Sequence, residues 1–153
     1  MNIFLEKFVK EKFKTPGASL DLGCGKGYDT ACLKHIGWKA LGVDKGEADL
    51  NKPYKAKNKF DLVYSNYVLQ FIDKREVFVK SCYDNLKKDG WLFIHTFGKN
   101  DALFKDKGLD RKEISELLKK YFKNIEIKEL SAYDNQFGHK HWHKIMEVTA
   151  QKN

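Results

Sequence analysis

The sequence predicts an α/β fold in which helices flank a doubly wound, mostly parallel β-sheet with an antiparallel C-terminal hairpin. Short apolar runs alternate with segments whose apolar residues recur at helical spacing, as in strand–helix–strand units. A glycine-rich turn joins the first predicted strand to the helix that follows it. Two further strands succeed one another near the C-terminal end without an intervening helix, which predicts a hairpin.

The first half of the chain is expected to contain a helix, a strand, a helix and a strand, over residues 2–14, 18–22, 28–36 and 39–43. The sequence Thr15-Pro16-Gly17 ends the first helix, and Gly37 ends the second. Both strands are short and apolar, as buried parallel strands are. The segment 45–59 is too short and too polar to hold another strand and helix, so this edge of the sheet is expected to be truncated.

The second half continues the alternation, with strands expected over residues 60–65, 91–97, 125–130 and 142–150 and helices over residues 73–86 and 110–121. Asp89-Gly90 is expected to stop the first of these helices. Asp110 and Glu113 have the spacing of a capping box at the start of the second.

A chain of 153 residues, 42% of them hydrophobic, is predicted to form one domain over residues 1–153. Its net charge of +8 raises the possibility of a nucleic-acid partner. Only two of the 29 basic residues are arginines, however, and the lysines are scattered along the chain, so nucleic acid is not the favoured partner.

The three cysteines do not form a C-x-x-C motif, and their odd number argues against a disulfide framework. The first 14 residues carry charges that a signal peptide would lack, and no run of about 18 apolar residues could cross a bilayer. A cytoplasmic protein without a membrane segment is therefore expected.

The turn after the first strand reads Asp21-Leu22-Gly23-Cys24-Gly25-Lys26-Gly27. Glycines at such a turn allow positive φ angles and let a ligand lie against the backbone. A dinucleotide-binding loop needs a small residue where this chain has Tyr28, and the acid that precedes the glycines suits an ammonium group better than a phosphate. The alternative is a tight turn without a ligand.

This D-x-G-x-G-x-G loop resembles that of the class I methyltransferases, which have a Rossmann-like fold and use S-adenosyl-L-methionine. The resemblance runs from Ala18 to about Trp91 and weakens beyond it. It implies that Gly23, Gly25 and Gly27 pass beneath the cofactor, that Asp21 holds its amino acid part, and that Asp44 accepts the ribose hydroxyls. The neighbouring residues Cys24 and Lys45 belong to the same expected cofactor-binding set. For Asp44, a helix cap or a surface charge is the alternative.

Two later segments complete the implied cofactor site. Asp49-Leu50 is similar to the family's adenine-binding pair, with a plain polar loop as the alternative. Ser65-Asn66-Tyr67-Val68-Leu69-Gln70-Phe71 is similar to the family's post-strand motif, whose backbone borders the methyl group. Its first three residues, Ser65, Asn66 and Tyr67, belong to the expected cofactor-binding set. The helix over residues 1–14 could cover the site with Phe4 or Phe8, as in the similar tellurite-resistance methyltransferases, although Phe8 and Phe13 also suit a packed core.

Methyl transfer from a sulfonium is an in-line displacement, so a base is needed only when the acceptor carries a proton. Tyr67, His95, His139 and His141 are candidates by position, and no catalytic residue is assigned. A buried structural role is the alternative for His95. The alternating residues His139, His141 and His143 would share one face of a strand, but with no evident acidic partner a metal site is not predicted.

The favoured function is methyl transfer from S-adenosyl-L-methionine to a small molecule, since the chain has little room for a separate substrate-recognition domain. The alternatives are an RNA or protein methyltransferase and a non-catalytic cofactor-binding subunit.

Overall fold

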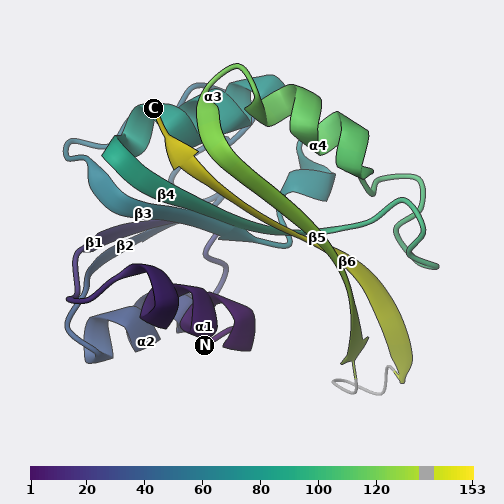
Figure 1. The fold of residues 1–153 in the computed structure, drawn as a ribbon, viewed down its shortest axis with the longest axis horizontal. Helices are drawn as coiled ribbons and strands as arrows, with labels where there is room; N and C mark the ends of the chain where they lie inside the picture. Colours follow the sequence, from purple (N-terminus) through teal and green to yellow (C-terminus); the bar gives the residue numbers. More distant parts are fainter. Residues whose placement is uncertain (135–139) are drawn as a thin grey trace.

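The computed structural model of the chain describes residues 1–134 and 140–153 (Figure 1). Its six strands form one sheet in the order β2-β1-β3-β4-β6-β5. The strands are β1 (Ala18–Leu22), β2 (Lys39–Val43), β3 (Phe60–Asn66), β4 (Leu86–Phe97), β5 (Phe122–Asp134) and β6 (His141–Lys152). The helices are α1 (Ile3–Lys12), α2 (Tyr28–His35), α3 (Arg75–Asn85) and α4 (Arg111–Leu118), with a short 3-10 turn η1 (Leu69–Phe71).

The first four strands in this order are parallel, and β6 is antiparallel to both β4 and β5. The predicted mostly parallel sheet with an antiparallel C-terminal hairpin is therefore confirmed. Residues 45–59 contain neither helix nor strand, so β2 is the edge strand and the expected truncation is also confirmed. The carboxyl ends of β1 to β4 meet at one edge of the sheet, where such folds bind ligands.

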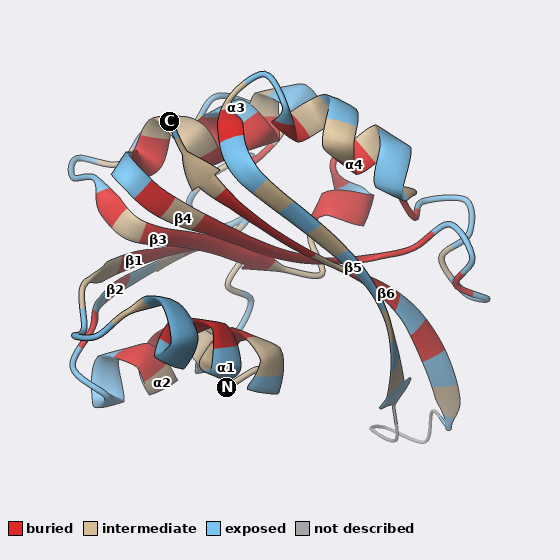
Figure 2. Cartoon of the chain, in the orientation of Figure 1, coloured by how far each residue is buried: buried red, intermediate tan, exposed pale blue. Residues whose placement is uncertain are grey.

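Helices cover both faces of the sheet, with α1 and α2 on one face and α3 and α4 on the other (Figure 1). Leu5, Leu33 and Phe93 belong to the core beneath α1 and α2, whereas Phe78 and Ile114 belong to the core beneath α3 and α4. Strands β1 and β3 and the second half of β4 are largely buried, while the edge strand β2 is partly exposed and the far end of the β5–β6 hairpin is largely exposed (Figure 2). None of the helices in the described ranges is long and apolar enough to cross a membrane.

The boundary between α3 and β4 differs from the prediction. The helix was expected to include Leu86 and the next strand to begin at Trp91, but α3 ends at Asn85 and β4 begins at Leu86. Leu86 is opposite Phe60 in the sheet, and this apolar pairing replaces another helical turn. Asp89, with a φ of 59°, makes its bend inside β4 rather than after a helix.

The C-terminal hairpin is longer than predicted. Strands β5 and β6 pair from Phe122 opposite Lys152 to Asp134 opposite His141. The polar, solvated residues near their ends give no alternating hydrophobic pattern, which is why the sequence indicates only the inner part of each strand.

Candidate functional site

The glycine loop after β1 has the backbone geometry that its sequence predicts. Gly23, Gly25 and Gly27 have φ angles of 89°, 52° and 74°, in the left-handed region that favours glycine. A Cβ on Gly23 would lie 2.3 Å from the Cγ2 atom of Val68, so no side chain fits there. A Cβ on Gly25 or Gly27 would have no heavy atom within 4 Å, so the backbone at these two glycines borders open space.

Asp44 follows β2 and connects the two neighbouring loops. One carboxylate oxygen accepts a hydrogen bond from the backbone N–H of Gly25 at 2.6 Å, and the other accepts from the N–H of Lys45 at 2.8 Å. Each oxygen of a carboxylate can accept a second hydrogen bond. Asp44 can therefore hold the glycine loop and still receive two ligand hydroxyls.

A cleft of about 420 Å³ lies between these loops and the segment after β3. It is lined by six residues of the predicted cofactor-binding set, namely Gly23, Asp44, Lys45, Asp49, Leu50 and Tyr67. Val68 and Phe71, from the predicted motif after β3, also line the cleft, and three residues that the sequence did not indicate complete its wall: Ala48, Asn51 and Ile72. The carboxylate of Asp49 is exposed, whereas Leu50 is buried and also belongs to the core.

Tyr67 has a φ of 61°, which is uncommon for a residue with a large side chain. The backbone N–H of Tyr67 donates to the carbonyl of His95 at 2.8 Å, and the side-chain amide of Gln70 donates to the backbone carbonyl of Tyr67. Its ring stacks against Phe97 at a centroid distance of 5.1 Å. Strained backbone of this kind concentrates at functional sites, and here it sets the position of the ring beside the cleft.

Two carboxylates lie beside the glycine loop. Asp21 is buried, with its carboxylate accepting a hydrogen bond from the hydroxyl of Thr30 at 3.2 Å. Burial and the nearby charge of Asp29 raise the pKa of Asp21 to about 7, although hydrogen bonds from Tyr64 and Thr30 oppose the shift. A bound cation would favour the ionised form, so this pair suits the ammonium group of a methionine.

Asn66 contacts one of these two carboxylates. Its side-chain N–H donates to Asp29 at 2.8 Å, and its side-chain oxygen is buried without a hydrogen-bond partner among the described residues. A buried acceptor that lacks a donor is uncommon, and a bound ammonium group would satisfy it. The site residues therefore fit S-adenosylmethionine by their charge and by their open backbone.

The remaining predicted cofactor residues do not line the cleft. The hydroxyl of Ser65 donates to the carbonyl of Leu22 inside the sheet, where Ser65 is fully buried. Cys24 lies within the loop, with its sulfur facing the backbone of Gly42. A cofactor contact through the backbone of either residue stays a prediction.

The start of α1 reaches the same edge of the sheet. The backbone N–H of Asn2 donates to Asp29 at 2.7 Å, and its side-chain amide lies 3.3 Å from Nδ1 of His95. The ring of Phe4 packs on His95 at 5.2 Å, whereas Phe8 is buried in the core beside Phe93. The core interpretation of Phe8 is thus confirmed, and of the two candidates Phe4 is the one that packs on His95.

His95 is fully buried and bonded on both ring nitrogens. Its Nε2 atom lies 3.2 Å from a carboxylate oxygen of Glu147, and its Nδ1 atom faces Asn2. The structural alternative therefore describes His95 better than a catalytic role.

The histidines at the start of β6 have an acidic partner, contrary to expectation. Nδ1 of His143 lies 2.9 Å from the carboxylate of Asp101, and Nε2 of His143 lies 2.9 Å from Nε2 of His141. His139 lies outside the described residues. Within the described ranges, no three potential ligands gather around a common point where a metal could bind.

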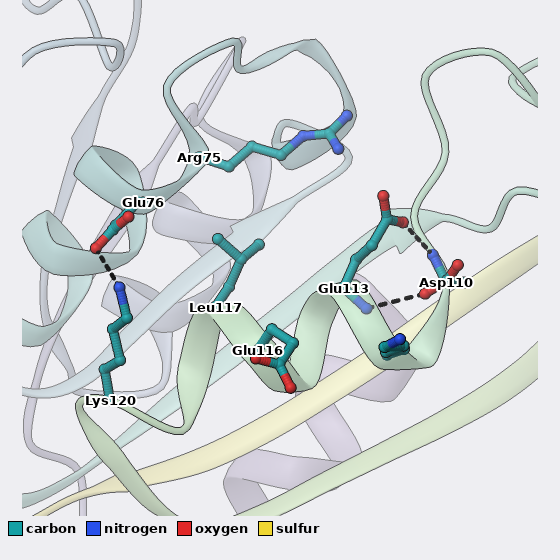
Figure 3. A pocket seen from close by; sticks show the side chains of 8 residues that line it. Arg75, Glu76, Asp110, Glu113, Glu116, Leu117 and Lys120 are labelled. Atoms are coloured by element: carbon teal, nitrogen blue, oxygen red, sulfur yellow. Dashed lines mark hydrogen bonds and ion pairs between the residues drawn. The ribbon is translucent and has the colours of Figure 1, made fainter.

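A second hollow, of about 560 Å³, lies between α3 and α4 (Figure 3). It contains none of the predicted site residues. Among its charged side chains, Lys120 forms an ion pair with Glu76, whereas the carboxylates of Asp110 and Glu113 each accept from the backbone N–H of the other residue in the confirmed capping box. It therefore offers no evident ligand group.

Asp29, Asn2 and Asp101, which contact predicted residues without lining the cleft, were also not indicated by the sequence. An acid in the first turn of a helix, like Asp29, is common because it stabilises the helix dipole, so it carries no signal of its own. Asn2 and Asp101 acquire their partners only through contacts between distant parts of the chain.

Comparisons with known proteins agree with this geometry. The sequence profile of a family described as "Methyltransferase domain" matches residues 3–147. The chain is 29% identical over 96 residues to the malonyl-[acyl-carrier protein] O-methyltransferase of Calditerrivibrio nitroreducens, covering 54% of this chain and 39% of that protein. It is 27% identical over 110 residues to the mitochondrial ubiquinone biosynthesis O-methyltransferase of Bos taurus, covering 56% of this chain and 30% of that protein.

The chain thus spans 30% to 39% of the length of these two relatives. Among solved structures, TehB from Haemophilus influenzae superposes with a TM-score of 0.76 at 17% identity, over 100% of this chain and 63% of that one. At 17% identity the superposition shows only a shared fold, whereas the family match over residues 3–147 shows that the chain has a methyltransferase domain. Because the glycine loop, the fold and the family match over residues 3–147 agree, the chain belongs to the class I S-adenosylmethionine-dependent methyltransferases.

Proposed function

We propose that this protein transfers the methyl group of S-adenosylmethionine to a small-molecule acceptor. The observation that carries the proposal is the cleft at the carboxyl edge of the sheet, where the glycine loop and Asp44 border one side and Tyr67 the other. In this arrangement Asp44 would accept the ribose hydroxyls, and Leu50 would pack on the adenine. The cofactor supplies the electrophilic methyl group, and the protein supplies its orientation and a site shielded from water.

The amino acid part of the cofactor would lie toward the two carboxylates beside the glycine loop. Asp21 and Asp29 together provide negative charge for an ammonium group, and the oxygen of Asn66 provides a further acceptor. Because the buried Asp21 carboxyl has its pKa raised to about 7, it ionises most readily when a cation is present. These contacts would hold the sulfur end of the cofactor near Tyr67.

A small acceptor is favoured by the position of α1. Its first residues contact Asp29 and His95 at the edge of the sheet, so they narrow the approach to the site from that side. Two relatives are named as O-methyltransferases, one of them in ubiquinone biosynthesis, which agrees with a small oxygen-bearing acceptor. The net charge of +8 is the observation that favours the alternative, an RNA acceptor.

Incubation with methyl-labelled S-adenosylmethionine tests the proposal. The protein is mixed separately with a small-metabolite extract, with bulk RNA and with a protein extract, and the label in each fraction is counted. We expect label in the small-molecule fraction, and much less transfer in a matched reaction with Asp44→Ala at a cofactor concentration below the dissociation constant of that variant. Label in RNA or protein alone would contradict the small-molecule acceptor. Cofactor binding without transfer to any fraction would favour a non-catalytic subunit.

A further inference from the structure

Two adjoining hollows lie at the edge of the sheet opposite the cofactor cleft, where the parallel strands begin. Their volumes are about 520 and 620 Å³. Both are lined by Ala18 at the start of β1, by Lys39 at the start of β2 and by Lys87 near the start of β4, so they form one groove. We call it the lysine groove. Its lining includes no residue of the predicted cofactor-binding set.

Lysines dominate the charge of this groove. Six of the residues that line it are lysines, and all six are exposed: Lys12, Lys14, Lys34, Lys39, Lys57 and Lys87. Among the described residues of the lining, Asp61 alone supplies a carboxylate, and it pairs with Lys87 at 2.9 Å. Six lysines against one carboxylate leave five net positive charges in the groove.

Local structure accounts for only some of these lysines. Lys12 and Lys34 lie in the last turns of α1 and α2, where a basic residue stabilises the end of a helix. Lys14, Lys39 and Lys57 lie outside the helices, and within the described part of the chain they form no ion pair. Their positive charges are therefore available to an anionic partner.

The parallel sheet gathers these lysines from segments that are far apart in the sequence. The amino ends of β1 to β4 lie at one edge because the four strands are parallel. The lysines belong to the ends of α1 and α2 and to the starts of these strands or the segments that lead into them. The folded chain thus has a basic surface that the scattered sequence positions do not indicate, and such a surface attracts phosphate groups.

We propose that the lysine groove binds the phosphate backbone of single-stranded nucleic acid. A flexible strand can follow a concave, positively charged groove and meet several lysines in turn, whereas a flat bilayer cannot enter it. A protein partner fits less well, because lysine is depleted at protein interfaces. The large aromatic side chains of Trp38 and Phe60 in the groove are also buried, so they offer no apolar anchor to a protein.

The composition of the groove predicts that it recognises the backbone and not the bases. Its lining includes no arginine, the side chain best suited to contacts with base edges. Single-stranded RNA and DNA should therefore bind alike and without sequence preference. Because the groove and the cofactor cleft lie at opposite ends of the parallel strands, a bound strand leaves the cleft open. This docking surface is separate from the proposed methyl transfer and does not depend on it.

Fluorescence anisotropy with labelled oligo(U) and oligo(dT) of equal length tests the proposal over a range of salt concentrations. We expect a dissociation constant of about 10⁻⁴ to 10⁻⁶ M at physiological salt, as is usual for binding through phosphates. With five net positive charges, the logarithm of the binding constant should fall with the logarithm of the salt concentration at a slope of about −3 to −4. Binding of only one of the two oligonucleotides would overturn recognition through the backbone.

A pair of double variants locates the binding surface. Lys14→Ala with Lys39→Ala removes two lysines of the groove, and it should weaken binding about tenfold at low salt and reduce the salt slope by about two. Lys74→Ala with Lys105→Ala removes two exposed lysines outside the groove and should bind like the parent. Circular dichroism of both proteins confirms that they are folded.

The remaining outcomes would each overturn the proposal. Equal weakening in the two double variants would mean that the overall charge of the protein attracts the strand. Displacement of the oligonucleotide by S-adenosylhomocysteine would mean that the strand occupies the cofactor cleft. Binding of poly-glutamate or of vesicles containing phosphatidylserine as tightly as the oligonucleotides would mean that the groove does not select a phosphate backbone.

Discussion

Asp21 shows at the residue scale how burial changes the ionisation of a carboxyl group beside the glycine loop. Its side chain is 4% exposed and lies beside Asp29, so the free protein holds its pKa near 7 rather than at its usual value of 3.8. The neutral form therefore predominates below pH 7. An ammonium group nearby would favour the ionised form, so ligand binding and ionisation of Asp21 are coupled.

This coupling predicts that cofactor affinity depends on pH. Because only ionised Asp21 attracts the ammonium group, the affinity for S-adenosylhomocysteine should rise by up to about tenfold per unit between pH 5.5 and 7 and then level off. Asp21→Asn should bind more weakly and lose this dependence. Calorimetric titrations of both proteins at several pH values make the comparison, and a parent affinity that is constant over this range would contradict the assignment of Asp21.

The sequence indicates the candidate role of a residue where that role depends on a local sequence pattern. The spacing of the glycines and the place of Asp44 at the end of a strand can be read directly, and the structure places Gly23 and Asp44 in one cleft. The pairing of Asp101 with His143 spans 42 positions, and that of Asn2 with His95 spans 93. Such contacts depend on the assembled sheet, so no local pattern could indicate them.

At the scale of elements, the residue that caps α1 also contacts the edge of the sheet where the candidate site lies. The side-chain oxygen of Asn2 caps the helix by accepting from the N–H groups of Phe4 and Leu5, at 2.9 and 3.2 Å. The amide end of the same side chain faces His95. One residue thus fixes both the start of the helix and its contact with the carboxyl edge of the sheet.

Asn2→Ala should lower the free energy of unfolding by about 0.5–2 kcal/mol, because two N–H groups of the first turn lose their acceptor. Asn2→Ser is the matched control, since serine retains a capping oxygen but cannot reach His95. Urea denaturation of the three proteins measures the difference. If serine and alanine destabilise equally, the cap is not the source of the effect and the contact with His95 accounts for the loss.

Elements with a strong hydrophobic pattern were predicted well, and the exceptions have a physical cause. The bounds of β1 and β2 agree with prediction because glycines or polar residues end each apolar run. The end of α3 does not, because Leu86 suits a helix face and a strand equally, and its partner Phe60 decides between them. Pairing across the sheet is a tertiary contact that overrides local preference.

At the scale of the whole molecule, the parallel sheet gathers the ends of β1 to β4 on one edge. The glycine loop, Asp44, Tyr67 and Asp101 are far apart in the sequence, yet each directly follows one of these strands or lies a few residues beyond it. The ring of Tyr67, which lines the cofactor cleft, stacks on Phe97, and Phe97 in turn contacts the ring of His143. The parallel sheet therefore brings residues from distant parts of the sequence together around the candidate cofactor site.

The central claim is that S-adenosylmethionine occupies the cleft beside Asp44, and calorimetric titration with S-adenosylhomocysteine tests it most directly. Charge-assisted hydrogen bonds are worth about 1.5–3 kcal/mol, so Asp44→Ala should weaken binding by about one to two orders of magnitude. Asp106→Ala, an exposed acid outside the cleft, should bind like the parent. A folded Asp44→Ala protein, checked by circular dichroism, whose affinity stays within twofold of the parent would contradict the claim.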